Sequence, residues 1–380
     1  MWLVVPSFYQ GDLLRALVAT DEIDLQAIFS RHLSEDRIQL GWKNDVDDYP
    51  FRFLDERNRT TDAVRSAWLQ RDRIHVVNGM WMEPSFAAAL TTLAAIGGTY
   101  AVYSEAPDPN ISRSHAKRLL STAFGRFIVG RASGYFPVSE QGAEFFKRLG
   151  ARSDTIYPYG YFRSNSNSRG NSACYRDQDR TELVFVGQIV RRKGIDLLLD
   201  AVKPLFTEHP ELHLSIIGTG DLTESTLEWI EAHKLNDRVI VEGSLPSHQV
   251  VSRLKRADLL VLPSRWDGWG IVVNEAFAAG VPVVVSDRCG ASELVSNDIN
   301  GFVFRSEDVS DLRNCIQRFL KNRSKWDRLR CEAAVMATRV SAEAIAPYFL
   351  GCLKHMVRIF DEPPRPPWME VSEPFSTNTI

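Results

Sequence analysis

Residues 259–286 read LLVLPSRWDGWGIVVNEAFAAGVPVVVS, and this stretch predicts more about the fold than any other part of the chain. It begins with an apolar run, continues through a turn with one acidic residue to a helical pattern with a second, and ends in another apolar run. Apolar runs separated by helices indicate parallel strands that are covered on both faces. The stretch therefore predicts a strand, a helix and a second strand of a doubly wound α/β domain.

The turn in this stretch carries the residues that we predict for the active site. Asp267 lies in the turn, and Glu275 follows about two helical turns later. The backbone N–H groups of Gly268, Trp269 and Gly270 lie where the helix is expected to begin. Unpaired N–H groups and the positive end of the helix dipole favour a phosphate or diphosphate at that place. Two carboxylates repel such a group, so we assign them to hydroxyl groups on either side of it, which makes the expected ligand a nucleotide sugar.

The same string resembles the signature of the retaining glycosyltransferases of family four, the glycosyl transferases group 1 with the GT-B fold. The family pattern reads PSxxE, FG, EA and xGxPVV, and it is matched here by Pro263, Ser264, Asp267, Trp269, Gly270, Glu275, Ala276, Gly280, Pro282, Val283 and Val284. Asp267 stands where the family has Glu, and Trp269 where it has Phe. From the two acids alone an ordinary strand, turn and helix would be the better interpretation. The resemblance implies two Rossmann-like doubly wound α/β domains that face each other across a cleft.

Length and composition agree with a two-domain protein without a nucleic-acid partner. The chain has 380 residues, of which 44% are hydrophobic and 24% charged, and this is enough for two cores. A net charge of −3 provides no global basic field. The opening MWLVVP is too short for a signal peptide, and no apolar run is long enough to cross a bilayer, so we expect a cytoplasmic protein. Five cysteines without a CxxC pair fit free thiols in a reducing compartment: Cys174, Cys289, Cys315, Cys331 and Cys352.

The carboxyl-terminal half alternates most clearly, and we expect it to form the donor domain, residues 181–340. Its expected strands are Leu183–Gly187, Leu212–Gly218, Val239–Gly243, Asp258–Pro263, Pro282–Ser286 and Gly301–Phe304. Its expected helices are Ile195–Phe206, Thr223–His233, His248–Arg256, Ile271–Ala279 and Asp308–Phe319. This pattern predicts a parallel sheet with helices on both faces.

The amino-terminal half, residues 1–165, has the same pattern with less regularity and is the expected acceptor-side domain. Strands are expected near Trp2–Val5, Ile74–Val77, Thr99–Ser104, Tyr135–Val138 and Thr155–Tyr157, and helices near Asp12–Ala19, Asp62–Leu69, Met82–Ala95, Ser114–Ile128 and Glu140–Leu149. Residues 21–60 cannot be assigned from their pattern. Residues 163–180 are polar and form the expected linker. A helix over about 341–360 would complete the first domain, as the resemblance implies, and the Pro-rich tail 361–380 is expected to be extended.

A second motif, LVFVGQIVRRKGIDLLLDAV over residues 183–202, resembles the family string VGRxxxxKG. The resemblance implies that Gly187, Gln188, Arg192 and Lys193 contact the donor, with Lys193 on the diphosphate. The family arginine is Gln188 here, so either Arg191 or Arg192 replaces its charge, or Lys193 acts with helix starts alone. By itself the segment would be read as a solvated basic turn.

Two further turns resemble donor-binding loops of the family. The glycines of Ile217-Gly218-Thr219-Gly220-Asp221 permit a close approach of the backbone to a ligand, but the third glycine of a dinucleotide fingerprint is missing. Glu242-Gly243-Ser244-Leu245 matches the loop whose main chain faces the nucleobase in the family. We therefore add Gly218, Gly220 and Leu245 to the donor site, and the donor is expected to be a UDP- or GDP-sugar.

No metal and no further cofactor are expected. Asp45-Val46-Asp47-Asp48 has the letters of a metal-binding DxD motif, but it follows no strand and is better read as a solvated loop. Lys193 and helix starts can neutralise the diphosphate, and the resemblance implies a metal-independent enzyme. Motifs of zinc proteases, serine hydrolases and P-loop kinases do not occur.

The acceptor side has weaker signals. Helix 114–128 is expected to have one apolar stripe, with basic residues off it: Ala116, Leu119, Leu120, Ala123, Phe124, Phe127 and Ile128, with Lys117, Arg118 and Arg126. A core-packed helix is the first interpretation, and a surface for anionic lipid headgroups or a lipid-linked diphosphate is the second. His115 and Glu105 are the candidate acceptor-side residues. The expected acceptor is a glycan or a lipid-linked acceptor, with peripheral contact at the inner face of the membrane.

Together these motifs predict a hexosyltransferase that moves a sugar from a nucleoside-diphosphate sugar to an acceptor hydroxyl with retention. Asp267 would orient the sugar, Glu275 the ribose, and Lys193 the leaving diphosphate. The resemblance implies that the leaving phosphate takes the proton of the acceptor, and that the product is a bacterial capsule, exopolysaccharide or lipopolysaccharide. A nucleotide-sugar epimerase and, because Gln188 and Asp267 are atypical, a non-catalytic sugar-nucleotide binder are the alternatives. A nicotinamide oxidoreductase is the least favoured class.

Overall fold

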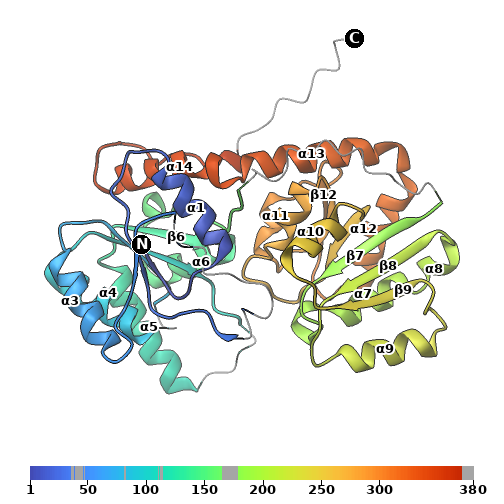
Figure 1. Cartoon of the computed structure of the whole chain (residues 1–380), viewed down its shortest axis with the longest axis horizontal. Coiled ribbons are helices and arrows are strands. Elements are labelled where there is room, and N and C mark those ends of the chain that lie inside the picture. Colours follow the sequence, from blue (N-terminus) through green and yellow to red (C-terminus); the bar gives the residue numbers. More distant parts are fainter. Residues whose placement is uncertain are drawn as a thin grey trace, which may run out of the picture.

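The computed structural model describes residues 1–35, 38, 46, 48–80, 83–109, 111, 114–164 and 179–369. These residues form two lobes side by side, each with its own sheet and helices (Figure 1). Each sheet has six strands, and all of the paired strands run parallel. The predicted α/β class with two doubly wound domains is confirmed.

The amino-terminal sheet has the order β3-β2-β1-β4-β5-β6. Strands are added on one side of β1 up to β3 and on its other side from β4 onward, so the strand order changes between β1 and β4. Its strands are β1 (Trp2–Leu3), β2 (Ala27–Phe29), β3 (Phe51–Phe53), β4 (His75–Asn78), β5 (Tyr100–Glu105) and β6 (Gly134–Val138). The helices around it are α1 (Phe8–Val18), α3 (Arg59–Leu69), α4 (Pro84–Ile96), α5 (His115–Val129) and α6 (Ser139–Leu149). This strand order places the carboxyl ends of β1, β4, β5 and β6 along one edge, where a doubly wound sheet binds its ligands.

The carboxyl-terminal sheet repeats this topology, with the order β12-β11-β10-β7-β8-β9. Its strands are β7 (Thr181–Val186), β8 (Leu212–Ile217), β9 (Val239–Gly243), β10 (Leu259–Leu262), β11 (Val283–Ser286) and β12 (Gly301–Phe304). Its helices are α7 (Ile195–Val202), α8 (Leu205–Glu208), α9 (Thr223–Ala232), α10 (Ser247–Leu254), α11 (Val272–Ala278) and α12 (Val309–Lys321). The first strand of the lobe, β7, pairs with both β8 and β10, so the reversal point lies between β7 and β10.

Three expected elements differ from the structure. The strand expected at 155–157 is wrong, because a 3-10 turn at Ser153–Thr155 is followed only by isolated bridges to β6. The helix expected over 195–206 is interrupted at Pro204, which has no N–H to donate, and α8 begins after it. The unassigned region 21–60 contains the short strands β2 and β3 at the edge of the first sheet.

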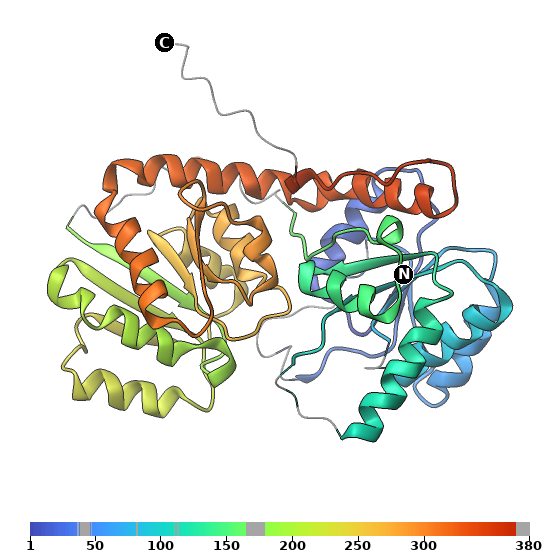
Figure 2. The same cartoon turned by 180° about the vertical axis from the view of Figure 1, so that it is seen from behind.

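The chain crosses between the lobes twice, and the two crossing segments pair with each other. Arg163 forms an isolated bridge with Ser341, and the N–H of Ala342 donates to the carbonyl of Arg163 at 2.9 Å. The helix α13 (Trp326–Arg339), absent from the sequence prediction, lies on the carboxyl-terminal lobe, and α14 (Ala342–Met356) crosses onto the other lobe and packs against α1. Figures 1 and 2 show these helices as a band along one side of both lobes.

The tail does not remain extended over its described part. Pro367–Met369 form a 3-10 turn, and the ring of Trp368 is buried. It packs against Phe162 of the first crossing segment and Tyr348 of α14, with ring centroids 5.5 and 5.9 Å apart. The expectation of an extended tail is therefore wrong at these residues. Residues 370–380 and residues 165–178 of the expected linker lie outside the described part.

Helix α5 is not core-packed along its whole length. Leu119 is 72% and Leu120 71% exposed, whereas Ile128 near the end of the helix is fully buried. The first turns of α5 project from the amino-terminal lobe (Figure 2), so they have no core to pack against. The first interpretation, a stripe buried throughout, is therefore wrong for this half of the helix.

Candidate active site

A cavity of about 440 Å³ lies between the lobes, at the carboxyl ends of both sheets. The amino-terminal lobe and the crossing segment contribute Phe8, Tyr9, Glu105 and Tyr161 to its wall. The carboxyl-terminal lobe contributes the turns after β7, β8 and β10 and the start of α11. This position is the one that parallel α/β sheets use for ligands.

Most of the residues predicted for the site line this one cavity: Glu105, Gly187, Gln188, Lys193, Gly218, Leu245, Asp267, Trp269, Gly270 and Glu275. The three side chains to which we assigned chemistry, Lys193, Asp267 and Glu275, therefore share it. Gly220 and Gly268 are not among its lining residues, and neither is Arg192. His115 is the first residue of α5, but its side chain lies outside the described part.

Lys193 and Asp267 form an ion pair in the cavity wall. Lys193 follows β7 in a 3-10 turn, and Asp267 follows β10. Because β7 and β10 are paired parallel neighbours, their carboxyl ends bring the two side chains together. Both side chains are largely buried, at 15% and 12% exposure, so neither charge is fully solvated. A diphosphate in the cavity would find the Lys193 ammonium already oriented by a carboxylate.

Glu105 approaches the same point from the opposite lobe. It ends β5 and accepts a hydrogen bond from the hydroxyl of Tyr161. Burial raises the pKa of Glu105. The hydrogen bond from Tyr161 lowers this pKa in part, and the nearby Asp267 carboxylate raises it. A Cβ on Gly268 would lie 2.1 Å from a carboxyl oxygen of Glu105, so a larger residue there would require the Glu105 side chain to move.

Glu275 is held by a network that the sequence did not reveal. The guanidinium of Arg163 donates to Glu275 Oε1 at 3.3 Å and to Asp12 Oδ2 of α1 at 3.0 Å. Burial raises the pKa of Glu275, and the charge of Arg163 opposes that rise. Arg163 lies in the crossing segment that we assigned to a linker, where no motif marks it. Its contacts link a carboxylate of the cavity wall to the opposite lobe.

Trp269 anchors the turn after β10 to the crossing segment. Its indole is buried, and Nε1 donates to Asn274 Oδ1 at 2.9 Å, while Asn274 donates to the carbonyl of Tyr161 at 3.1 Å. A Cβ on Gly160 would lie 2.3 Å from the indole ring, so the ring occupies the space of a missing side chain. This contact explains how the chain accommodates Trp where the family has Phe.

The two arginines of the second motif do not line the cavity. Arg192 donates to the carbonyl of Trp266 at 2.8 Å and so supports the turn after β10. Arg191 lines a separate hollow beside α7 and α9. The prediction that Arg192 binds the donor stays a prediction, since Arg192 contacts the turn backbone and does not line the cavity. Among the three basic residues of this motif, Lys193 lines the cavity.

The backbone of the turns differs from the prediction in one respect. Helix α11 begins at Val272, so the N–H groups of residues 268–270 belong to the preceding turn and not to the helix start. The turns after β7 and β8 touch directly, since a Cβ on Gly218 would lie 1.9 Å from the carbonyl oxygen of Gly187. Gly218 also has φ +142°, which disfavours other residues. Gly220 packs against Ile189 in the same way and shapes the turn from outside the cavity.

Neither a metal centre nor a membrane-spanning helix is found in the described part of the chain. No group of three or more His, Cys, Asp or Glu side chains there is placed to hold a metal ion. Asp45 and Asp47 of the DxD-like loop lie outside it, so metal independence stays a prediction. No described helix is both long and apolar enough to cross a bilayer.

Two facing Rossmann-like domains with a cavity at the carboxyl ends of both sheets define the GT-B class of folds. A structural neighbour of this class is HepE of Anabaena in complex with UDP, with a TM-score of 0.73 and 15% identity over 93% of this chain and 99% of that one. At this identity the likeness concerns the fold. The GT-B architecture is thus established for the described chain.

Sequence comparison places the carboxyl-terminal lobe more closely. Residues 175–335 match the family model of the glycosyl transferases group 1. The putative teichuronic acid biosynthesis glycosyltransferase TuaC of Bacillus subtilis (strain 168) is 31% identical over 252 residues, 64% of this chain and 61% of that protein. The putative colanic acid biosynthesis glycosyltransferase WcaL of Escherichia coli (strain K12) is 29% identical over 144 residues, 36% of each chain. The matches cover between about a third and three-fifths of these relatives, and the match to the glycosyl transferases group 1 model lies within the carboxyl-terminal lobe and α13.

Proposed function

We propose that the chain is a retaining hexosyltransferase that moves a sugar from a nucleoside-diphosphate sugar to an acceptor hydroxyl, without a metal ion or further cofactor. One observation carries the proposal: Lys193, Asp267 and Glu275 line one cavity between the lobes together with the glycine turns after β7 and β8. The group 1 family match of the carboxyl-terminal lobe supports a nucleotide-sugar donor.

The proposed roles follow the movement of charge during the reaction. As the bond between sugar and phosphate breaks, the sugar becomes electron-poor and the diphosphate gains negative charge. Lys193 stabilises that charge, and the N–H groups of Trp269 and Gly270 add donors to it. Asp267 orients the sugar hydroxyls, and Glu275 the ribose. The leaving phosphate takes the proton of the acceptor, so no side-chain nucleophile takes part.

The acceptor side of this proposal rests on the amino-terminal lobe. Glu105 lies opposite Lys193 and Asp267, where an acceptor hydroxyl would have to approach the sugar. The exposed Leu119 and Leu120 lie on α5 with exposed Lys117 and Arg126, a combination that suits an anionic lipid surface. We propose a cytoplasmic enzyme that works at the inner face of the membrane on a glycan or lipid-linked acceptor.

The relatives support a role in the synthesis of a bacterial surface polysaccharide, such as a capsule or lipopolysaccharide. TuaC and WcaL are named for teichuronic acid and colanic acid biosynthesis. The complex of HepE with UDP supports a uridine nucleotide in the donor, and a guanosine nucleotide remains the alternative.

A nucleotide screen followed by a donor assay tests the proposal. We expect UDP or GDP to raise the melting temperature of the protein, because binding to the folded state alone stabilises it. The matching UDP- or GDP-sugars are then incubated with and without a glycan acceptor, and the products are analysed for anomeric configuration. A glycoside with the configuration of the donor is the expected product. An isomerised donor formed without acceptor would identify an epimerase, and binding without turnover a non-catalytic binder.

A further inference from the structure

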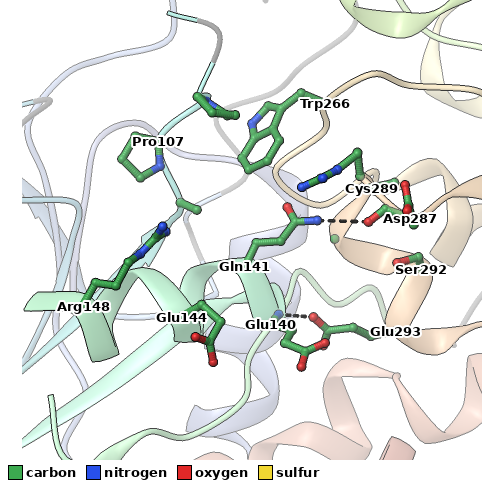
Figure 3. A pocket seen from close by; sticks show the side chains of 14 residues that line it. Pro107, Glu140, Gln141, Glu144, Arg148, Trp266, Asp287, Cys289, Ser292 and Glu293 are labelled. Carbon is green, nitrogen blue, oxygen red and sulfur yellow. Dashed lines mark hydrogen bonds between the residues drawn. The ribbon is translucent and has the colours of Figure 1, made fainter. Parts of the chain in front are cut away.

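Two contacts between the lobes differ in their relation to the donor cavity, which is the cavity of about 440 Å³ described above. In one contact, Gln141 of α6 donates to the carbonyl of Asp287 at 3.2 Å (Figure 3). Both residues line a second cavity, of about 580 Å³, and none of its described lining residues lines the donor cavity. In the other contact, Arg163 connects Asp12 of α1 to Glu275, and Glu275 lines the donor cavity. The contact made by Arg163 therefore reaches the donor site.

Arg163 approaches the Glu275 carboxylate from outside the donor cavity. Its Nη1 donates to Glu275 Oε1 at 3.3 Å, yet Arg163 is not among the residues that line the cavity. In the described part of the chain, no group donates a hydrogen bond to the other oxygen, Oε2. The protein thus holds one oxygen of this carboxylate and leaves the second available to a ligand in the cavity.

The guanidinium of Arg163 is itself fixed by neighbours on the amino-terminal lobe. Its Nε donates to Asp12 Oδ2 at 3.0 Å, and its plane lies over the ring of Phe8, 4.4 Å from the centroid. Asp12 is buried and also accepts from Arg15 at 2.8 Å and from the N–H of Ser164 at 2.9 Å. Because the donors of a guanidinium lie in one rigid plane, a fixed Nε also fixes the direction of Nη1.

The backbone of Arg163 has little freedom to move. Its carbonyl accepts from the N–H of Ala342 at 2.9 Å, which joins the two crossing segments. The preceding residue, Phe162, is buried against Trp269 and Trp368, with ring centroids 6.4 and 5.5 Å apart. A change in the position of Arg163 would therefore require this whole packed segment to shift.

The ribose of a nucleotide requires a carboxylate in one particular state. Its two neighbouring hydroxyl groups donate hydrogen bonds, and an ionised carboxylate is the acceptor with both oxygens available. Burial raises the pKa of Glu275, and the charge of Arg163 opposes that rise. Without the guanidinium, a buried carboxylate takes up a proton or turns toward another donor. Either change removes an acceptor from the ribose.

We propose that Arg163 is a positioning residue of the donor site: it holds the Glu275 carboxylate so that the free oxygen faces the ribose hydroxyls, and the site thereby selects ribonucleoside diphosphates. The inference rests on the proposed function, in which Glu275 contacts the ribose. Arg163 acts through Glu275 and does not touch the nucleotide. Part of the donor site is then built by the amino-terminal lobe, because Asp12 orients the guanidinium.

Paired nucleotides test this role by calorimetry on the whole chain. UDP is compared with 2′,3′-dideoxy-UDP, which lacks both ribose hydroxyls, and GDP with its dideoxy counterpart. We expect the wild type to bind the preferred ribonucleotide about tenfold or more tightly than its dideoxy form, since bonds to an ionised acceptor are strong. Arg163→Gln should reduce this preference to about threefold or less and change the affinity for the dideoxynucleotide by less than about twofold. A general loss of structure would weaken both nucleotides equally.

Three further variants separate positioning from a structural role. Arg163→Lys keeps the charge but offers one nitrogen in place of a planar group, so it should retain only part of the preference. Gln141→Ala is the matched control, because it removes a hydrogen bond between the lobes away from Glu275, and it should keep the wild-type preference. In a Glu275→Gln background, Arg163→Gln should have no further effect on the preference. Melting temperatures without nucleotide show whether each variant is folded.

The outcomes separate this inference from the proposed function. Equal affinity of the wild type for both members of each pair overturns the inference, and so does a wild-type preference in folded Arg163→Gln. A further loss of preference in the Glu275→Gln background overturns it as well. Nucleotide binding, and with it the proposed transferase function, stands in all three cases. If Arg163→Gln does not fold, a wild-type preference in Arg163→Lys overturns the inference instead. If neither UDP nor GDP binds the wild type, the proposed function itself fails, and the inference fails with it.

Discussion

The two lobes have the same strand order, yet they differ in how they contribute to the cleft. In the carboxyl-terminal lobe, glycine turns and the pair Lys193–Asp267 follow directly on buried strands. In the amino-terminal lobe, the side chains that reach the cleft come from scattered places, such as Tyr9 of α1 and Glu105 at the end of β5. A nucleoside diphosphate needs a fixed backbone shape around it, whereas an acceptor can be met by side chains on any nearby loop. The first requirement leaves a motif in the sequence and the second does not.

The largest expected effect concerns the carboxyl-terminal lobe. Lys193→Ala should lower kcat/KM about a hundredfold, because a charge-assisted hydrogen bond to the diphosphate contributes about 1.5–3 kcal/mol and Asp267 loses its partner as well. Steady-state kinetics with the nucleotide sugar found in the screen would measure this. Lys203→Ala, at the exposed end of α7, is the matched control and should retain wild-type rates. Activity of Lys193→Ala within twofold of the control would contradict the assigned role.

The second effect concerns the amino-terminal lobe. Replacing both Leu119 and Leu120 with Asp should reduce binding to phosphatidylcholine vesicles that contain phosphatidylglycerol by about tenfold or more, since apolar burial is lost and negative charge is added. The matched control, Leu227→Asp with Ile240→Asp, changes two exposed apolar residues of the other lobe. Co-sedimentation with vesicles gives the bound fraction. If both double variants lose binding equally, or neither does, α5 is not the membrane-facing element.

The same contrast explains what could be predicted from the sequence. The strands of the carboxyl-terminal lobe and the shared position of Lys193, Asp267 and Glu275 could be predicted, because continuous apolar runs and spaced motifs fix them. Pattern alone did not reveal β2 and β3, which are three-residue edge strands. Arg163 was missed because its partners, Asp12 and Glu275, are distant in sequence. The exposure of the first half of α5 could not be predicted either, because the sequence pattern of an apolar stripe is the same for a helix packed on a core and for one that faces a membrane.

A smaller effect is expected where the lobes meet at Trp269. Gly160→Ala should lower the free energy of unfolding by about 1–3 kcal/mol, because its Cβ would overlap the indole. Chemical denaturation would measure the loss. Gly11→Ala is the matched control: a Cβ there meets only ordinary van der Waals contacts, with the Tyr49 hydroxyl and the Arg15 guanidinium, so no loss is expected.

Trp269→Phe sharpens this test, because it shortens the ring that faces Gly160. The double variant Gly160→Ala/Trp269→Phe should lose less stability than the sum of the single variants, which is the signature of direct contact. Strict additivity would show that the indole does not lie against Gly160 in solution. The contact between this turn and the crossing segment would then be absent.

The smallest effect is a change in pH dependence at the other interlobe contact. Burial raises the pKa of Glu293 to about 7, although the hydrogen bond from the N–H of Glu140 lowers it in part. The folded protein therefore binds a proton more tightly than the unfolded chain does, and the associated stability is lost as pH rises through 7. We expect the melting temperature to fall between pH 5.5 and about 8. Glu105 and Glu275, whose pKa values are also raised by burial, add to the fall in the same direction.

Glu293→Gln should reduce this slope, since the amide keeps an acceptor for the N–H of Glu140 and does not titrate. Glu144→Gln is the matched control: the hydrogen bond from Lys147 lowers the pKa of the exposed Glu144, so its titration lies below this pH range. If Glu293→Gln and Glu144→Gln both keep the wild-type slope, Glu293 is solvated and the lobes do not touch at α6.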